Sequence, residues 1–403
     1  MTVLDASLLR NSRWWQWSAA VGLTRLPPAM APLASIFAGR ETSGSYAFGA
    51  LLAGSYALCE SLGAPRLGRA LDRCPPDSRA GRMRSALVLS GTSLTGLAVA
   101  VYAAAPSWLL VLLTMLAAFS SSGVPGGYRA MLTELVSPAQ LLTALSWDAT
   151  LLEAEWLIGP ILVALTLAGG QPAVAYLVMA GCAIGAALLS YLVPSTPERP
   201  AAERSDARGA WRHRASWPCY LTSGTLGTAE GGFIAALPAL LTSLHGHASA
   251  AGLFAALLGL ASMIGGVGLS VLQSRLVGGP GRLADWSLLI MCASLGSATL
   301  VPSVYWLVVP VLAGGLFIAP VNALRGQALE QTLPAALRSE GFSFQYGAYG
   351  VGAAAGSALV ALVVASSAHI AVVLVLAIPA LLSAASLALQ AGRGAVLARR
   401  DAG

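Results

Sequence analysis

The sequence contains little charge. Its 403 residues include 23 basic and 17 acidic side chains, so charged residues make up 10% of the chain, compared with about 25% in soluble globular proteins. Apolar residues make up 56%, and the mean hydropathy is +0.73. This composition excludes a disordered chain, which requires low hydrophobicity and high charge density. It also argues against a soluble enzyme of two or three domains, and predicts a membrane protein.

Lysine is absent, because every basic residue is an arginine. A P-loop needs a lysine, so ATP cannot drive this chain through that motif. No G-x-S-x-G or H-E-x-x-H appears either, and we therefore expect no enzyme activity. The five cysteines are odd in number and widely spaced, which excludes a disulfide framework. His245 and His247 lack a third ligand nearby, so we expect no metal and no cofactor.

Twelve apolar segments are each long enough to cross a bilayer as a helix. The first of them is too long for the core of a signal peptide, so we expect it to be retained. The sequence therefore predicts an all-α membrane protein with twelve transmembrane helices, at residues 15–39, 45–64, 84–104, 108–128, 145–168, 172–193, 217–243, 249–273, 284–301, 304–324, 342–366 and 369–391.

The arginines alternate with these segments. If the N-terminus is cytoplasmic, every arginine except Arg25 and Arg40 falls at the cytoplasmic side, as the positive-inside rule requires. The net charge of +6 is then explained by topology and anionic lipid rather than by nucleic acid. We expect a multi-pass protein of a bacterial plasma (inner) membrane with both termini in the cytoplasm. Its partners would be membrane lipid, a small-molecule substrate and protons.

The longest polar stretch divides the helices six and six. Residues 194–216 are rich in Pro, Arg, Ser and Ala, which predicts a cytoplasmic linker between bundles at 1–193 and 217–403. The halves also match at an offset of 196 positions, where RAMLTELVSPAQL from Arg129 resembles RGQALEQTLPAAL from Arg325. A duplicated six-helix unit is typical of secondary transporters, whose halves rock about a central site.

Together these features resemble the major facilitator superfamily over essentially the whole length. The segment GAPRLGRALDR matches the family's G-x-x-x-D-R signature through Gly68, Asp72 and Arg73. The resemblance implies a loop that packs beneath the helix ends and stabilises the outward-facing state. The arginines that usually follow arrive late, so this loop is expected to be longer than the family pattern.

Weaker matches lie in the fourth and fifth predicted helices. Arg129 resembles the family's arginine near the end of helix 4, and Arg325 is its counterpart in the repeat. Gly159 and Pro160 resemble the glycine-proline motif of the drug and metabolite efflux branches. All four are assigned to conformational change by this resemblance. The alternative for the Gly-Pro pair is a kink or a point of close packing.

An ionisable group inside a bilayer has a high free energy of insertion, so each such residue is a candidate for a functional role. Arg25 and Glu230 lie near the middle of the first and seventh predicted helices, which the resemblance places along the substrate pathway. Two roles are open. The residues form a fixed ion pair, or Glu230 carries a proton that a nearby arginine gates.

The fifth predicted helix carries three acidic residues. Helical spacing places Asp148 and Glu155 on one face and Glu153 nearly opposite. Asp148, near the cytoplasmic end, is expected to be solvated or paired with arginine. Of the deeper pair, at least one faces the interior, and the resemblance to a D-x-x-x-x-E pattern favours Glu153 narrowly.

Polar and aromatic residues complete the predicted cavity. Gln345, Tyr346 and Tyr349 are expected to offer directional contacts and a stacking surface to an amphiphilic ligand. Anchoring at the membrane interface accounts for Tyr346 equally well. The cluster Trp14, Trp15 and Trp17 is predicted to be an interfacial belt.

The sequence thus favours a monomeric secondary active transporter that works by alternating access. The predicted function is proton-coupled export of a small organic, amphiphilic compound. The excess of acidic over basic residues inside the membrane favours either a proton carrier or a cationic or zwitterionic ligand. The alternatives are proton-coupled uptake of a sugar or another small nutrient, and a non-transporting scaffold or membrane-embedded enzyme. Substrate identity and direction are not encoded in recognisable motifs.

Overall fold

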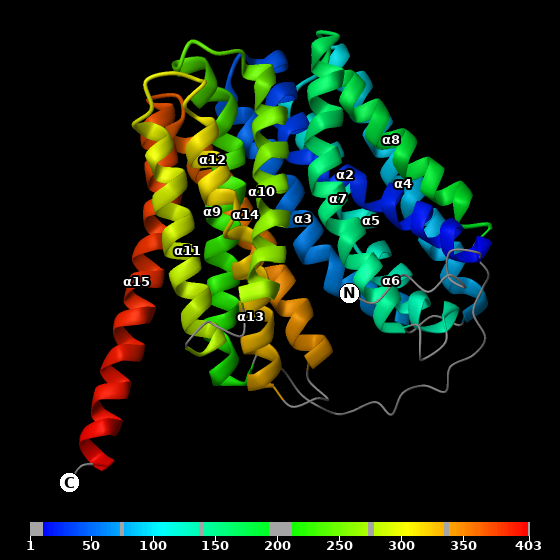
Figure 1. Cartoon of the computed structure of the whole chain (residues 1–403). Coiled ribbons are helices and arrows are strands. Elements are labelled where there is room, and N and C mark those ends of the chain that lie inside the picture. Colours follow the sequence, from blue (N-terminus) through cyan, green and yellow to red (C-terminus); the bar gives the residue numbers. More distant parts are fainter. Residues whose placement is uncertain are drawn as a thin grey trace. The chain divides into compact units, whose positions relative to one another are not determined.

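The computed structural model describes residues 11–72, 76–136, 141–192, 212–272, 278–333 and 338–401. These residues form α-helices and short 3₁₀ helices, and none of them lies in a strand (Figure 1). A helix satisfies its backbone groups internally, which is what an apolar segment needs in lipid. The predicted all-α class is therefore confirmed.

The chain divides into two compact units, Met1–Arg204 and Ser205–Gly403, called here the N-terminal and C-terminal units. The boundary falls inside the segment predicted as a linker, of which residues 193–211 lie outside the described part. The N-terminal unit contains α2 (Ser12–Ser43), α3 (Tyr46–Asp72), α4 (Pro76–Tyr102), α5 (Ser107–Ser121), α6 (Val124–Leu135), α7 (Leu141–Ala168) and α8 (Pro172–Leu189).

The C-terminal unit contains a second set of helices. They are α9 (Trp217–Ser243), α10 (Ala251–Leu272), α11 (Pro280–Gly296), α12 (Val308–Gly315), α13 (Ile318–Thr332), α14 (Arg338–Val363) and α15 (Ala368–Asp401). Three 3₁₀ turns accompany them, at Arg214–Ser216, Ala248–Ala250 and Ser297–Thr299. The last helix continues well beyond the predicted end of its apolar run, through residues whose pattern is polar and arginine-rich (Figure 1).

Each of the twelve predicted segments corresponds to one helix or to one interrupted pair. The fourth segment is interrupted between α5 and α6 at Gly123, and the tenth between α12 and α13 near Leu316. The two interruptions occupy equivalent places in the repeat. Among the described residues, nine helices are long and apolar enough to cross a membrane. The remaining predicted segments are α2 and α7, which carry ionisable residues, and the short α11.

The predicted loop around the G-x-x-x-D-R signature is mostly helical instead. Helix α3 continues through Gly68 to Asp72, and α4 already begins at Pro76. The Ala, Leu and Arg residues of this stretch are good helix formers, and Pro76 occupies the first helical position that proline tolerates. The expected long loop was therefore wrong. Arg73 and the side chain of Asp72 lie outside the described part of the chain.

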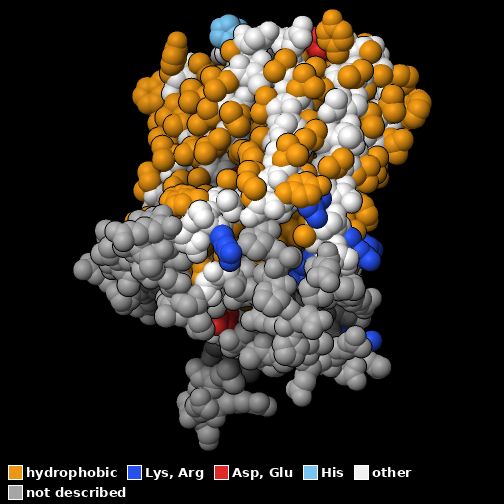
Figure 2. Space-filling view, turned by 90° about the vertical axis from the view of Figure 1, so that its right-hand side faces the viewer, with side chains coloured by type: hydrophobic (Ala, Val, Ile, Leu, Met, Phe, Trp, Pro, Cys, Tyr) orange, Lys and Arg blue, Asp and Glu red, His pale blue; other side chains and the backbone are white. Residues whose placement is uncertain are grey.

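The surface suits lipid. Large apolar side chains such as Leu112, Leu165 and Val267 are exposed. Figure 2 shows hydrophobic side chains over the described upper part of one face, with arginine side chains gathered toward its lower edge. Apolar exposure on this scale would promote association in water, so the protein is a multi-pass membrane protein.

Glycines bring α9 and α14 into close contact. A Cβ atom at Gly227 would overlap the carbonyl group of Tyr349, and one at Gly352 would overlap the backbone of Gly224. Small residues at such spacing let two membrane helices pack backbone to backbone. This packing places Tyr349 beside the part of α9 that carries Glu230.

We expect Gly227→Ala to destabilise the C-terminal unit by about 1–3 kcal/mol, because the added methyl group forces the two helices apart. Gly268→Ala in α10 is the matched control, since nothing lies within 4 Å of a Cβ at that position. Thermal unfolding of the purified variants in detergent measures both effects. Equal unfolding temperatures for the two variants would contradict the close packing.

Candidate functional site

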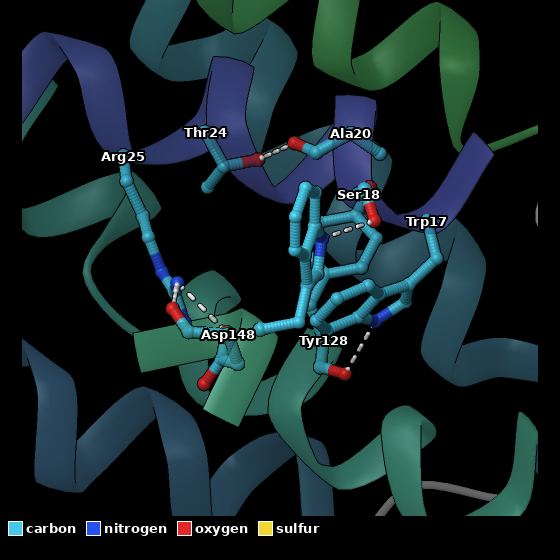
Figure 3. Close-up of polar contacts among 8 residues, drawn as sticks. Trp17, Ser18, Ala20, Thr24, Arg25, Tyr128 and Asp148 are labelled. Atoms are coloured by element: carbon cyan, nitrogen blue, oxygen red, sulfur yellow. Dashed lines mark hydrogen bonds and ion pairs between the residues drawn. The ribbon is translucent and has the colours of Figure 1, made fainter. Parts of the chain in front are cut away.

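The N-terminal unit contains a buried ion pair between α2 and α7. The Nη1 atom of Arg25 lies 2.8 Å from Oδ1 of Asp148, and the two side chains are 10% and 3% exposed. Figure 3 shows the arginine reaching from α2 to the aspartate. The same Nη1 lies 3.5 Å from the backbone carbonyl oxygen of Asp148. Of the two predicted settings for Asp148, pairing with arginine is confirmed and solvation is wrong.

Glu155 is the second carboxylate of this site. It follows Asp148 by two helical turns on the same face of α7, as the spacing predicts. The side chain is 4% exposed, and neither of its oxygens is hydrogen-bonded within the described structure. It interacts electrostatically with Arg25 and Asp148. A Cβ at Gly22 would lie 3.8 Å from its Oε1, so the glycine of α2 leaves space beside the carboxylate.

Tryptophans hold α2 against its neighbours around this pair. Trp17 donates from Nε1 to the carbonyl oxygen of Tyr128 at 2.9 Å, and Trp147 donates to the hydroxyl of Ser18 at 3.0 Å (Figure 3). Trp14 stacks on Trp17, and both are buried. The predicted interfacial belt is therefore wrong for these two, because they pack in the core, whereas Trp15 is exposed.

Besides Asp72 and Arg73, two more predicted residues of this unit lie outside the part whose side chains are described. These are Glu153 and Arg129, of which only the helical backbone is described, in α7 and α6. The narrow preference for Glu153 over Glu155 thus stays a prediction. The burial of Glu155 shows that at least one of the two acids faces the interior, as expected.

The Gly159-Pro160 pair lies at a close contact between helices. A Cβ at Gly159 would come within 2.8 Å of the side chain of Ala29 and 2.9 Å of its backbone. Pro160 lies inside α7, which continues to Ala168. Of the two interpretations of this pair, the geometry supports close packing of α7 on α2.

A second charged cluster occupies the C-terminal unit. The hydroxyl of Tyr349 donates to Oε2 of Glu230 at 2.9 Å. The guanidinium carbon of Arg325 lies 5.5 Å from the centre of the Tyr349 ring, and Nη2 of Arg325 donates to Oδ1 of Asn322. Three helices, α9, α13 and α14, therefore contribute to one group of polar side chains.

The residues predicted on α14 separate into two faces. Gln345 is 5% exposed and lies one turn before Tyr349 on the same face. Tyr346 is 52% exposed, because one residue along a helix turns the side chain by about 100°. The structure thus brings Gln345 and Tyr349 together and places Tyr346 elsewhere, which favours its interfacial role.

Asp285 was missed by sequence reasoning. It lies near the start of α11, is buried, and accepts hydrogen bonds from Thr222 at 3.1 Å, Ser386 at 2.7 Å and Gln390 at 3.0 Å. These bonds tie α11 to α9 and α15. The signal available in the sequence was a single acidic residue inside an apolar segment. Its carboxylate is fully engaged by donors, so we assign it to packing.

Both clusters contain buried polar atoms that have no hydrogen-bond partner among the described residues. Glu155 lacks a donor, while Arg325 and Gln345 retain polar atoms without a partner among the described residues. Such groups are costly to bury and are rare in native structures.

Comparison with known proteins agrees with this architecture. Residues 17–276 match the family described as Major Facilitator Superfamily. The nucleoside transporter NupG superposes with a TM-score of 0.71 at 11% identity, over 94% of this chain and 99% of that one. A search of the curated proteins found no match.

Two further solved structures share the fold. A bacterial homologue of the human lysosomal transporter Spinster, inward-facing and occupied, gives a TM-score of 0.69 at 14% identity over 96% of both chains. An auto-inhibited peptide transporter of the POT family gives 0.67 at 14% identity, over 94% of this chain and 97% of that one. At these identities the likeness extends to the fold alone.

Proposed function

This chain belongs to the Major Facilitator Superfamily of transporters. We propose that it exports a small organic, amphiphilic compound in exchange for protons. In this scheme the two units expose the site to each side of the membrane in turn. The chain would act as a monomer in a bacterial plasma membrane with both termini in the cytoplasm, as the arginine distribution indicates.

The observation that carries the proposal is the buried carboxylate of Glu155, whose oxygens accept no hydrogen bond from the described residues. Desolvation disfavours the charged form of a carboxyl group, whereas a nearby cation favours it. Glu155 experiences both influences, from its burial and from Arg25. When water reaches the site from one side, the group can exchange a proton, and when the site closes, the proton is retained.

Proteoliposome flux tests the proposal directly. Full-length protein is reconstituted with an internal pH-sensitive dye and challenged with a chemically broad set of amphiphilic compounds. We expect a compound-dependent proton flux opposite to the movement of the compound. Flux in the same direction would instead support proton-coupled uptake. Transport that is indifferent to an imposed pH gradient would overturn the coupling.

Glu230→Gln is expected to remove the pH dependence of transport while leaving expression and fold intact. The glutamine amide oxygen can still accept the hydrogen bond from Tyr349, so the local packing survives without the titratable group. Flux in proteoliposomes at two external pH values measures the effect, and size-exclusion chromatography checks the fold. Unchanged pH dependence in a folded variant would exclude Glu230 as a proton carrier.

A further inference from the structure

The guanidinium of Arg325 in α13 has unmet hydrogen-bonding capacity. The residue is 8% exposed, yet its Nε and Nη1 atoms have no hydrogen-bond partner in the described structure. Only Nη2 is engaged, by Asn322 one turn earlier. A guanidinium carries five N–H donors, and burying a cation without acceptors is far costlier than burying a neutral group. Packing alone therefore does not account for an arginine at this position.

The described neighbours of Arg325 do not provide acceptors for its Nε and Nη1 atoms. Tyr349 contributes its ring to the guanidinium, at 5.5 Å, and gives its hydroxyl hydrogen to Glu230. Glu230 is near enough to attract Arg325 electrostatically. Tyr349 therefore connects a cation and an anion, contacting one with its ring and the other with its hydroxyl.

Gln345, on the same face of α14 as Tyr349, has an unsatisfied hydrogen-bond acceptor in the described structure. Its amide oxygen is buried without a hydrogen-bond partner in the part of the chain described. It precedes Tyr349 by one helical turn. The unsatisfied donors of Arg325 on α13 thus contact the Tyr349 ring, and the unsatisfied acceptor of Gln345 lies one turn before Tyr349 on α14. A molecule that satisfies both must carry an acceptor group for Arg325 and an N–H or O–H donor for Gln345.

We propose that Arg325 binds a carboxylate of the transported compound, so that the substrates are amphiphilic organic acids, including amino acids. The proposal rests on the transport function inferred above and names its substrate class. The planar fork of arginine matches a carboxylate in geometry and charge. The negative charge of Glu230 disfavours a dianion such as phosphate at this place, which selects a monoanion.

Ligand-induced thermal stabilisation of the full-length protein in detergent tests the site. The probes are acetate, 3-phenylpropionate, decanoate and L-phenylalanine, each paired with its primary amide. The acid and the amide of a pair share a carbon skeleton, so a difference between them reports the carboxylate. We expect at least one acid, and not its amide, to raise the unfolding temperature of the wild type. If none of the four acids does so, the proposal is overturned.

Arg325→Gln tests whether Arg325 is the residue that binds the carboxylate. Arg282→Gln is the matched control, because Arg282 is an exposed arginine of the same unit. Loss of a charged hydrogen-bonding partner should weaken the apparent affinity for the acid about ten- to a hundredfold. Arg282→Gln should retain the wild-type response. An unchanged acid response in Arg325→Gln would overturn the assignment.

The unliganded variants separate binding from folding. Because Nε and Nη1 of the buried guanidinium have no hydrogen-bond partner in the described structure, Arg325→Gln should unfold at the wild-type temperature or above it. If Arg325→Gln does not fold, Arg325→Lys replaces it in the test. Lysine keeps the positive charge but lacks the planar guanidinium group, so this variant should also show a smaller rise in unfolding temperature with the acid. An unaltered response in Arg325→Lys would then overturn the proposal.

The binding assay contains no proton gradient, so its failure is distinct from failure of the transport mechanism. Acid binding without pH-driven flux would contradict the proposed coupling alone. Coupled flux of a compound that Arg325→Gln transports as well as the wild type would contradict the carboxylate site alone.

Discussion

Glu155→Gln is expected to reduce flux driven by a pH gradient to the level of protein-free liposomes. The amide resembles the protonated carboxyl group in size and lacks the proton that must be released. Exchange of compound across the membrane without net flux should persist, because the neutral side chain still allows the site to alternate. Measurements of pH-driven uptake and of counterflow in the same proteoliposomes separate the two activities.

The same substitution should leave the protein as stable as the wild type or more so. The glutamine removes a buried carboxylate that has no hydrogen-bond partner in the described structure, and groups of this kind are retained at the expense of stability. Glu41→Gln is the matched control, because Glu41 is an exposed acid of the same unit. If Glu155→Gln unfolds at a much lower temperature, Glu155 has a structural role instead.

The helical architecture was predictable from sequence because lipid restricts the choice so strongly. A stretch of about 20 apolar residues can only be a helix when its backbone must be satisfied internally. Arginine placement then fixed the number of segments. The interruptions at Gly123 and near Leu316 were not predicted, because both lie inside runs that remain apolar on either side.

The candidate site was predicted in its members but not in its pairings. Helical periodicity correctly joined Asp148 to Glu155, because that relation lies within one helix. Gln345 and Tyr346 were predicted to share the cavity, whereas the structure buries Gln345 and exposes Tyr346. The partner of Arg25 lies 123 residues away on α7, and no local pattern reports such a contact. The role of Arg325 was obscured for a related reason. Its position near a helix end suggested the cytoplasmic border, whereas tertiary packing buries it beside Tyr349.

Arg25→Gln is expected to produce the largest loss of stability in the N-terminal unit. Removing one partner of a buried ion pair leaves an uncompensated charge and costs about 3–5 kcal/mol. Here the remaining charge is Asp148, with the second carboxylate of Glu155 in electrostatic range. Unfolding in mixed detergent micelles measures the change in free energy. Arg13→Gln on the exposed part of the same helix is the control, with an expected change within about 0.5 kcal/mol.

A double-mutant cycle with Asp148→Asn decides what the pair contributes. Asp148→Asn alone should be milder than Arg25→Gln, because Arg25 keeps a carboxylate in Glu155, whereas Arg25→Gln leaves two acids without a cation. The double variant Arg25→Gln/Asp148→Asn should recover much of the loss, since a neutral pair replaces the charged one. Additive effects of the two substitutions would show that the ion pair is not coupled. The difference in stability loss between the two single variants is the more specific test, because it depends on the interaction of Glu155 with the positive charge of Arg25. Equal effects of the two single substitutions would remove Glu155 from this cluster and with it the gating of its proton by Arg25.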